Sequence, residues 1–374
     1  MKKNSATRIG IITSSLDNNK LSAPASCQLE LIKALRHISS PEIEIFLIHF
    51  KKGFNTEIYS RFNEVTCKKG IVATTKCINN LQLDVVHMNN LTYKWLGFYF
   101  LNTRKVVTIH GDASFVLPRS YFSKRVMVEE YIIRLIGKLG LLKRIDTFVV
   151  VSESLKKNLI KYLNKPANKI KIFYKGVGEK ISFQENAMHT VQKKWGICSP
   201  YLLNVNNFAP KKNIETLLVA FKAYKKNNKN LKLVLVGSGL RLELSKKISK
   251  MELEGDVVIL DHVQHADLSY LYSAATLLVN PTLHETFGLP NLEAMACRCP
   301  VLTSYRYSIP EVVGRAACMV QDPTDARELC ASMTQLLQNK SELNRMREQG
   351  ILEAQKFSWN RAAHQLITVY TTEI

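Results

Sequence analysis

Two glutamates with seven residues between them, Glu285 and Glu293, flank Gly288 and Pro290 just after an apolar run at residues 277–279. The apolar run suits a buried strand, and Pro290 suits the first turn of a helix, where a missing N–H costs nothing. A strand, a sharp turn and a helix start place backbone N–H groups at the carboxyl edge of a sheet, where α/β proteins bind phosphate-bearing ligands. Amides for phosphate and two carboxylates for hydroxyl groups together suit a nucleotide-sugar.

A second loop supplies positive charge. Asn207, Lys211 and Lys212 follow the expected strand at residues 201–205 and precede an expected helix. Adjacent cations there can neutralise a diphosphate leaving group, which is the main electrostatic demand of glycosyl transfer. The simpler alternative is two solvated lysines at a helix start, a position that the helix dipole makes mildly unfavourable for cations.

The segment around the two glutamates resembles the E-x7-E motif of retaining glycosyltransferases of the GT-B fold, in particular the large family 4. The resemblance extends over an ordered series: Pro281, Glu285, Phe287-Gly288-Leu289-Pro290, Leu292 to Cys297, Pro300-Val301, Pro310 to Gly314 and Asp322-Pro323. It is dense in the second half of the chain and thin in the first. The alternative is an ordinary helix N-terminus with two solvated glutamates.

The resemblance implies roles for the donor-side residues. Glu285 would bind the hydroxyl groups of the donor sugar, and Glu293 the ribose. Lys212 would stabilise the leaving diphosphate together with the backbone amides of the segment Phe287, Gly288 and Leu289, and Lys211 would replace an arginine that is usual in the family. Further donor contacts would come from Asn207, from Gly237 in the turn Gly237-Ser238-Gly239, and from the main chain of Val263.

His110 ends the expected strand at residues 105–110. A histidine at the carboxyl edge of a strand is placed for chemistry or substrate binding, and family members often carry one in this loop. His110 would therefore face the sugar and the acceptor from the first domain; the alternative is a structural histidine with satisfied hydrogen bonds. We expect Glu285, His110 and Lys212 to be the catalytic residues, with no metal ion and no cofactor beyond the nucleotide-sugar substrate.

Three departures from the family pattern concern the acceptor side and the donor helix. The loop at residues 21–26 contains no glycine, Lys175-Gly176-Val177-Gly178 replaces Asn-Gly-Val-Asp, and Arg298 stands where a glycine is usual. They raise the alternative of a catalytically degenerate subunit of a polysaccharide assembly complex. A nicotinamide-dependent oxidoreductase is excluded because no G-x-G-x-x-G follows the first strand.

Strand-like and helical segments alternate along all 374 residues, which predicts parallel sheets built from βαβ units. A chain of this length favours two domains. We predict an α/β fold of two Rossmann-like domains facing across a cleft: an acceptor-side domain at 1–183, a donor-binding domain at 184–356, and a C-terminal helix at 357–374 that crosses back to the first domain. The polar stretch 179–196 is the expected linker.

Positive charge is concentrated in the first half. Residues 1–183 contain 30 Lys and Arg against 13 Asp and Glu, and residues 184–374 contain 22 against 18, so the halves carry +17 and +4 of the total of +21. Nucleic acid and an anionic membrane are both candidate partners, but no nucleic-acid-binding module is recognisable. Residues 119–144 alternate apolar and basic side chains, as in a helix that docks on a membrane surface, or as in a core-covering helix with a solvated basic face.

Eight scattered cysteines without a C-x-x-C pair predict neither a zinc site nor a disulfide framework, and so favour a reducing compartment. No signal peptide or membrane-spanning run is recognisable. We therefore expect a cytoplasmic enzyme, peripheral at the inner face of the cell membrane. The family resemblance implies that it would transfer a hexose from a nucleoside diphosphate sugar to a glycan or lipid-linked acceptor in surface polysaccharide or glycolipid biosynthesis. Mannose is the preferred sugar because Pro210-Lys211-Lys212-Asn213 resembles the Arg-Lys-Asn branch that includes mannosyltransferases.

Overall fold

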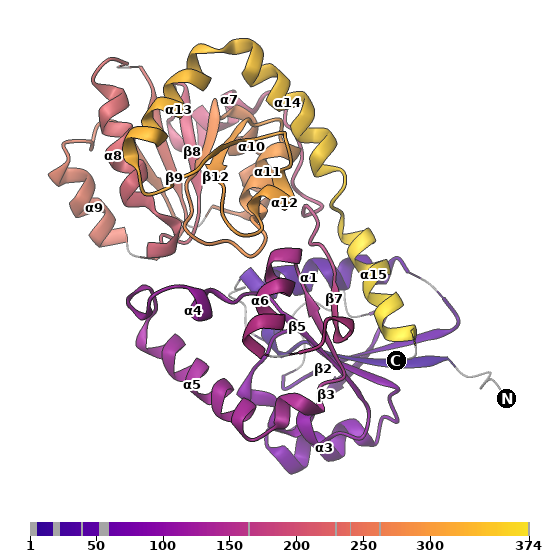
Figure 1. Cartoon of the computed structure of the whole chain (residues 1–374). Coiled ribbons are helices and arrows are strands. Elements are labelled where there is room, and N and C mark those ends of the chain that lie inside the picture. The colour runs from indigo at the N-terminus through magenta and orange to yellow at the C-terminus, as the bar shows by residue number, and fades with distance from the viewer. Residues whose placement is uncertain are drawn as a thin grey trace. The chain divides into compact units, whose positions relative to one another are not determined.

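The structure is a computed structural model that describes residues 6–17, 23–38, 40–51, 60–163, 165–228, 230–239, 241–261 and 263–372. The chain divides into two compact units (Figure 1): the first unit is Met1–Gly176 with Ser358–Ile374, and the second is Val177–Phe357. Each unit is built on one parallel sheet, so the predicted pair of Rossmann-like domains of a GT-B fold is confirmed.

The first unit contains a seven-stranded parallel sheet in the order β3-β2-β1-β4-β5-β6-β7. Its inner strands are rich in Val and Ile and buried on both faces, as expected for a parallel sheet covered by helices. The strands are β1 Thr7–Ile12, β2 Ile43–His49, β3 Asn63–Thr66, β4 Val85–Met88, β5 Arg104–Ile109, β6 Thr147–Val150 and β7 Ile170–Ile172.

Helices connect these strands. The α-helices of the first unit are α1 Ala23–Arg36, α3 Ile71–Asn79, α4 Ala113–Val116, α5 Lys124–Lys138, α6 Glu153–Leu163 and α15 Trp359–Thr371, and the short 3-10 segments are η1 Ser14–Leu16, η2 Tyr93–Phe100, η3 Arg119–Tyr121, η4 Leu141–Arg144 and η5 Ala167–Lys169. The glycine-free loop at 21–26 lies partly outside the described residues, because 18–22 are not among them.

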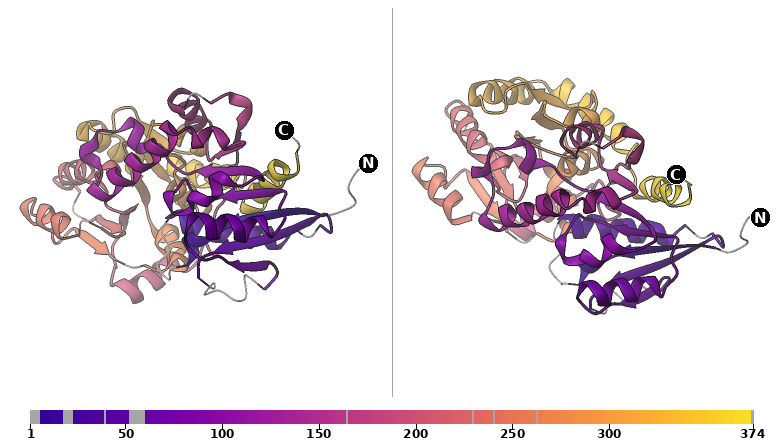
Figure 2. Two further views of the ribbon diagram at one scale, coloured as in Figure 1. Left: turned by 90° about the horizontal axis from the view of Figure 1, so that it is seen from below. Right: turned by 60° about the horizontal axis from the view of Figure 1, so that its bottom comes forward.

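The C-terminal helix α15 belongs to the first unit, as predicted, and packs against α1 (Figure 2). Tyr370 in α15 is buried, and its hydroxyl shares a hydrogen bond of 2.6 Å with Nδ1 of His87 in β4. At the end of the helix the Arg104 guanidinium donates to the main-chain carbonyls of Val369, Tyr370 and Thr372. The last helix therefore completes the core of the first unit.

The second unit contains a six-stranded parallel sheet in the order β10-β9-β8-β11-β12-β13. The strands are β8 Tyr201–Val205, β9 Lys232–Val236, β10 Val257–Leu260, β11 Leu277–Asn280, β12 Val301–Ser304 and β13 Cys318–Val320. The helices are α7 Ala187–Trp195, α8 Ile214–Lys225, α9 Arg241–Lys250, α10 Leu268–Ala274, α11 Leu289–Ala296, α12 Ile309–Val313, α13 Ala326–Gln338 and α14 Lys340–Ala354, with η6 Pro210–Lys212 and η7 His265–Asp267.

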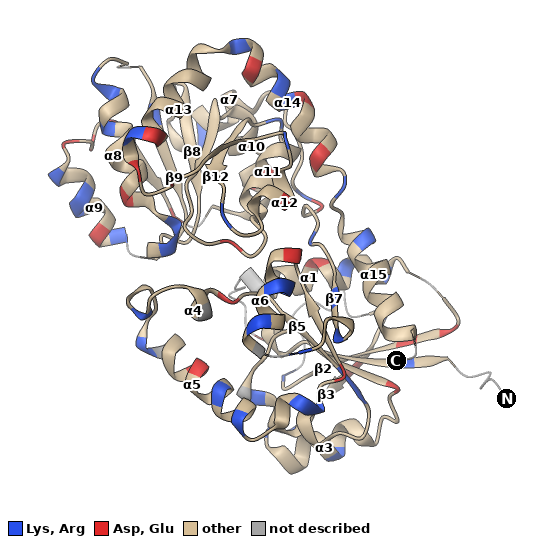
Figure 3. Cartoon of the chain, viewed as in Figure 1, with Lys and Arg blue, Asp and Glu red and all other residues tan. Residues whose placement is uncertain are grey.

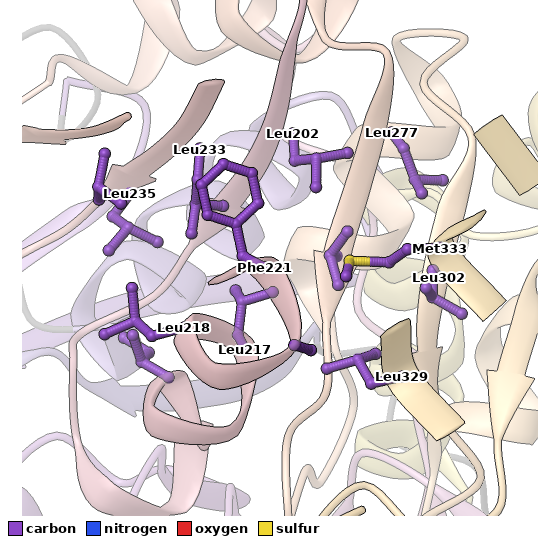
Figure 4. Packing of buried hydrophobic residues seen from close by; sticks show 14 of the residues in the cluster. Leu202, Leu217, Leu218, Phe221, Leu233, Leu235, Leu277, Leu302, Leu329 and Met333 are labelled. Atoms are coloured by element: carbon purple, nitrogen blue, oxygen red, sulfur yellow. The ribbon is translucent and has the colours of Figure 1, made fainter. Parts of the chain in front are cut away.

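One face of this sheet packs against α8 and α13 (Figure 4). Leu217, Leu218 and Phe221 of α8 meet Leu233 and Leu235 of β9, and Leu329 and Met333 of α13 lie beside Leu302 of β12. All of these side chains are fully buried or nearly so. This core fixes the strands whose carboxyl ends carry the candidate site.

The boundary between the units falls at Gly176 and Val177, earlier than the expected boundary after residue 183. The reason is that the following segment is attached to α10: the main-chain N–H groups of Ser182 and Gln184 donate to the hydroxyls of Ser269 and Ser273. The stretch expected as a linker also contains α7, which packs on α10.

The sequence predicted no disulfide framework, but the structure contains a disulfide bond. Cys67, just after β3, is bonded to Cys77 in α3, and the other six cysteines are free. The bond joins the end of an edge strand to the next helix. A spacing of ten residues between two cysteines does not predict such a bond from the sequence. None of the described helices is both long and apolar enough to cross a bilayer.

Candidate active site

The site residues of the second unit gather where the strand order reverses. β8 pairs with β9 on one side and with β11 on the other, so the loops that follow β8 and β11 diverge from adjacent strands. In open α/β sheets, such a switch point at the carboxyl edge is where ligands bind. The loop after β8 carries Lys211 and Lys212, and the loop after β11 carries Glu285.

Lys212 and Glu285 form an ion pair and a hydrogen bond between Nζ and Oε1. Their side chains are only 11% and 13% exposed, so little water screens the pair. Burial by itself would raise the pKa of Glu285, but the ammonium groups of Lys212 and then Lys211, together with His284, outweigh burial and lower this pKa. Glu285 is therefore a carboxylate at neutral pH.

The main chain holds these two loops together. The carbonyl of Lys211 accepts from the N–H of Leu283 at 2.8 Å and from the Thr282 hydroxyl at 3.0 Å. Asn213, in the left-handed conformation with φ of 59°, donates its side-chain amide to the carbonyls of Pro281 and Pro323. The Lys212–Glu285 distance is thus set by the scaffold and not by the two side chains alone.

A chain of buried amides lies beneath the loops. Asn206 donates to Asn204 and Asn280, Asn280 donates to Asn291 of α11 at 2.8 Å, and Asn291 donates to Thr303 of β12. Such a network keeps its members in one geometry, because each lost bond would leave a buried polar group unsatisfied. The ends of β8, β11 and β12 and the start of α11 are therefore coupled.

Helix α11 begins as the sequence predicts. Gly288 is its N-cap with φ of 93°, a value that a residue with a Cβ rarely adopts, and Pro290 occupies the first turn. The turn places Phe287, Gly288 and Leu289 at the N-terminus of the helix, where main-chain N–H groups and the helix dipole favour an anion.

Glu293 lies one turn further on and is 7% exposed. The Tyr272 hydroxyl donates to its Oε2 at 2.9 Å, and Nε2 of His265 lies 3.2 Å from its Oε1. Burial, followed by the Glu293 charge, raises the pKa of Tyr272 well above its ordinary value, so the hydroxyl stays a donor. Sequence reasoning missed both partners, since Tyr272 is indistinguishable from a core aromatic of α10 and His265 has no motif around it.

The turn after β9 needs glycine at residues 237 and 239 because of close main-chain contact and backbone conformation. A Cβ on Gly237 would lie 1.5 Å from the carbonyl oxygen of Asn206, and Gly239 has φ of 100°. The turn therefore packs on the loop that holds Asn207, which is exposed. Val263 follows β10 at the same edge of the sheet, on the far side of β9.

Arg298, the bulky residue at a position usual for glycine, adopts the left-handed conformation with φ of 59°. Its guanidinium lies 4.7 Å from the ring centre of Phe183. The left-handed backbone explains why glycine suits this position, and the stacking on Phe183 gives the arginine a place on the surface of the second unit.

His110 lies in the first unit, directly after β5, and the other predicted site residues lie in the second unit. Burial, followed by the charge of Lys175, lowers its pKa well below the ordinary value for histidine. His110 is therefore a neutral imidazole at the carboxyl edge of the first sheet. Among the described residues, no group of three or more His, Cys, Asp or Glu side chains could hold a metal ion.

Comparison with known proteins agrees with this geometry. Residues 190–353 match the glycosyl transferases group 1, and residues 68–179 match glycosyltransferase family 4. The chain is 31% identical over 282 residues to O-antigen chain mannosyltransferase B of Escherichia coli, with 71% of this chain and 70% of that protein covered. It is 28% identical over 252 residues to the serotype-specific mannosyltransferase WbdA of Escherichia coli, covering 63% of this chain and only 30% of that longer protein.

The fold is similar to that of sucrose-phosphate synthase from Thermosynechococcus elongatus, with a TM-score of 0.77, 18% identity, and 97% and 98% of the two chains covered. The same family assignment follows from the family matches, from the mannosyltransferase relatives and from the presence of two parallel sheets. The chain belongs to glycosyltransferase family 4, the retaining hexosyltransferases of the GT-B fold that use nucleotide-sugar donors.

Proposed function

We propose that this chain transfers mannose from a nucleoside diphosphate donor to a glycan or lipid-linked acceptor in the synthesis of a surface polysaccharide or glycolipid. The observation that carries the site is the part-buried Lys212–Glu285 pair beside the N-terminus of α11. The similarity to an O-antigen chain mannosyltransferase supports the choice of sugar and pathway class.

The proposed roles follow from charge and position. Lys212, assisted by Lys211 and by the amides at residues 287–289, stabilises the negative charge that develops on the leaving diphosphate. Glu285 accepts hydrogen bonds from the sugar hydroxyls and Glu293 from the ribose. His110, as a neutral imidazole, binds the sugar or the acceptor. Asn207, Gly237 and the main chain of Val263 line the nucleotide.

Donor binding is testable by thermal stabilisation with GDP-mannose, UDP-glucose and the free nucleotides. GDP-mannose should raise the melting temperature of the wild type most, and Lys212→Met should remove most of that shift. Lys226→Met, which removes an exposed lysine after α8, is the matched control and should keep it. Stabilisation by nucleotide-sugars without slow donor hydrolysis or transfer would instead identify a degenerate, non-catalytic subunit.

We further propose that the first unit acts at an anionic membrane surface, at the cytoplasmic face. The outward face of α5 carries an apolar stripe at helical spacing, with Val128, Tyr131 and Leu135 exposed by 58%, 70% and 45%. Leu139, immediately after the helix, extends it at 68% exposed, whereas Ile136 on the inner face is buried. A helix that only covered a core would not turn such a stripe to solvent.

Basic groups surround this stripe (Figure 3). Lys124, Arg134 and Lys138 of α5 are exposed. Nearby, η2 adds the half-exposed ring of Phe100, over which Arg144 of η4 stacks at 5.5 Å. Exposed apolar side chains beside lysine and arginine are the combination that binds anionic lipid head groups and inserts beneath them.

Sedimentation with vesicles separates this surface from an ordinary solvated helix. At low salt the wild type should bind phosphatidylglycerol vesicles and not phosphatidylcholine vesicles. Leu135→Glu should weaken binding at least tenfold, and Leu242→Glu, at a 76% exposed leucine of α9, should leave it unchanged. Absence of wild-type binding to phosphatidylglycerol would contradict the membrane role and leave the transferase assignment intact.

A further inference from the structure

The carboxyl edge of the first sheet brings together the ends of three neighbouring strands. β5 pairs with β6, and β6 pairs with β7, with Ile109 opposite Val150 and Val150 opposite Ile172. The segments after these strands carry His110 and Lys175 on the two sides of the β6 end. Lys175 occupies the position at which the family usually has asparagine.

Lys175 is a buried lysine to which the described residues supply no counter-ion. It is 8% exposed, and no hydrogen bond or ion pair joins its ammonium to another described residue. Lys105 is buried to a similar degree, at 7% exposed, but its ammonium has partners. It donates to the carbonyls of Leu101 and Thr103, both at 2.9 Å. An ammonium that no described residue pairs is available to an anionic ligand, which would supply the missing ion pair.

The backbone keeps Lys175 in place. The next residue, Gly176, has no room for a side chain, because a Cβ there would lie 2.1 Å from the main-chain nitrogen of Trp359 at the start of α15. The main chain at Gly176 therefore packs directly against the start of α15, and this contact fixes the backbone position of Lys175.

Two neighbouring polar groups, His110 and Asp112, lie on the segment that follows β5. The charge of Lys175 reaches His110, whose pKa lies well below its ordinary value, so the imidazole is neutral and brings no charge of its own. Asp112, the nearest carboxylate along the chain after His110, accepts a hydrogen bond from the side-chain amide of Asn158 in α6.

We propose that Lys175 binds a phosphate group of the acceptor, next to His110 at the carboxyl edge of the first sheet. The acceptor class is then a phosphate-bearing one, such as a saccharide joined to a lipid through phosphate. The assignment to an acceptor rests on the proposed function, whereas the anion site itself does not.

Equilibrium dialysis with labelled inorganic pyrophosphate tests the anion site, with saturating GDP present to fill the donor site. The wild type should still bind pyrophosphate, Lys175→Met should weaken binding at least tenfold, and Lys175→Arg should restore it. Lys157→Met, at an exposed lysine of α6, is the control and should bind as the wild type does. Equal binding by Lys175→Met, or no binding once GDP is present, would overturn the proposal.

A measurement on the unaltered protein guards against a variant that fails to fold. Acetylation of Lys175, followed by mass spectrometry in the presence of GDP, should slow when pyrophosphate is added, while acetylation of Lys157 should not change. Phosphatidylglycerol vesicles should leave this protection unaltered, because the proposed ligand is the acceptor phosphate; displacement by vesicles, or unchanged acetylation of Lys175, would refute it.

Steady-state kinetics with varied acceptor then test the phosphate contact of Lys175 separately from the proposed transferase activity. With a phosphate-bearing acceptor, Lys175→Met should raise the acceptor KM about tenfold. With the same glycan lacking phosphate, the acceptor KM should stay as in the wild type, whatever change in kcat follows from the lost charge beside His110. A rise in KM for both acceptors alike would reject the phosphate contact. Pyrophosphate binding in a wild type that transfers no sugar would instead reject the proposed function and retain the anion site.

Discussion

The Tyr272 hydroxyl donates a hydrogen bond of 2.9 Å to Glu293, and both groups are buried in the second unit. The bond links α10 to the donor-side helix α11 and fixes one oxygen of the carboxylate. The other oxygen faces His265 at 3.2 Å. Glu293 is therefore held in one orientation, and its freedom to adapt to a ligand is small.

Removal of that bond should weaken donor binding. A hydrogen bond to a charged group contributes about 1.5–3 kcal/mol, so Tyr272→Phe should raise the donor KM about tenfold or more with a smaller effect on kcat. Tyr270→Phe, in the same helix, is the control. Steady-state kinetics with varied donor decide the matter, and an unchanged KM would show that Glu293 does not depend on Tyr272.

The Lys212–Glu285 pair should act as a unit in transfer. We expect Lys212→Met and Glu285→Gln each to lower kcat at least 100-fold, the scale of losing one main electrostatic contact to a transition state. The double variant should be little worse than either single one, because the two residues share one interaction. If the decrease in kcat of the double variant equalled the product of the two single decreases, the two side chains would act independently.

Acid should destabilise the first unit through His87. This side chain is fully buried between the hydroxyls of Thr108 and Tyr370, and burial lowers its pKa from the ordinary 6.5 to about 3. Below pH 6.5 this histidine binds a proton in the unfolded chain but stays neutral in the folded chain. The free energy of unfolding therefore falls as the pH falls, by about 1.4 kcal/mol per pH unit down to about pH 3. His110 contributes in the same direction.

His87→Gln should flatten that dependence, even though it lowers stability at pH 7. Urea unfolding between pH 7 and pH 4 measures the slope, with His189→Gln, at an exposed histidine, as the control. The same slope in His87→Gln as in the wild type would mean that His87 is not responsible.

The Cys67–Cys77 disulfide should stabilise the edge of the first sheet. Loop closure over a separation of ten residues corresponds to about 3 kcal/mol from the unfolded chain. Dithiothreitol or Cys77→Ser should therefore lower the free energy of unfolding by about that amount, and Cys198→Ser, at an exposed free cysteine, should not. Alkylation of all eight cysteines in the native, unreduced protein would contradict the pairing.

The sequence allowed the inner strands to be predicted because burial on both faces leaves a continuous apolar run. The inner strands Ile43–His49 and Tyr201–Val205 were predicted with the bounds that the structure has, and so was the edge strand Val257–Leu260. Two of the edge strands, β3 and β13, were missed. β3 is Asn63-Glu64-Val65-Thr66, mostly exposed, and a strand paired on one side only needs no apolar run.

The candidate site was predictable where a motif dictates local backbone, as at Gly288 and Pro290. It was not predictable where distant residues meet. Tyr272 reaches Glu293, and Asn206 reaches Asn280, only because parallel strands align their ends. The Cys67–Cys77 bond likewise depends on how α3 turns back toward β3, which spacing alone does not reveal.

The assignment of α15 to the first unit has a consequence for biosynthesis. A ribosome delivers residues 1–176 long before the residues that follow Phe357, yet Tyr370 supplies the partner of His87 and part of the apolar core. The first unit therefore cannot complete its core until the whole of the second unit has been synthesised, whereas the second unit contains no segment from outside residues 177–357.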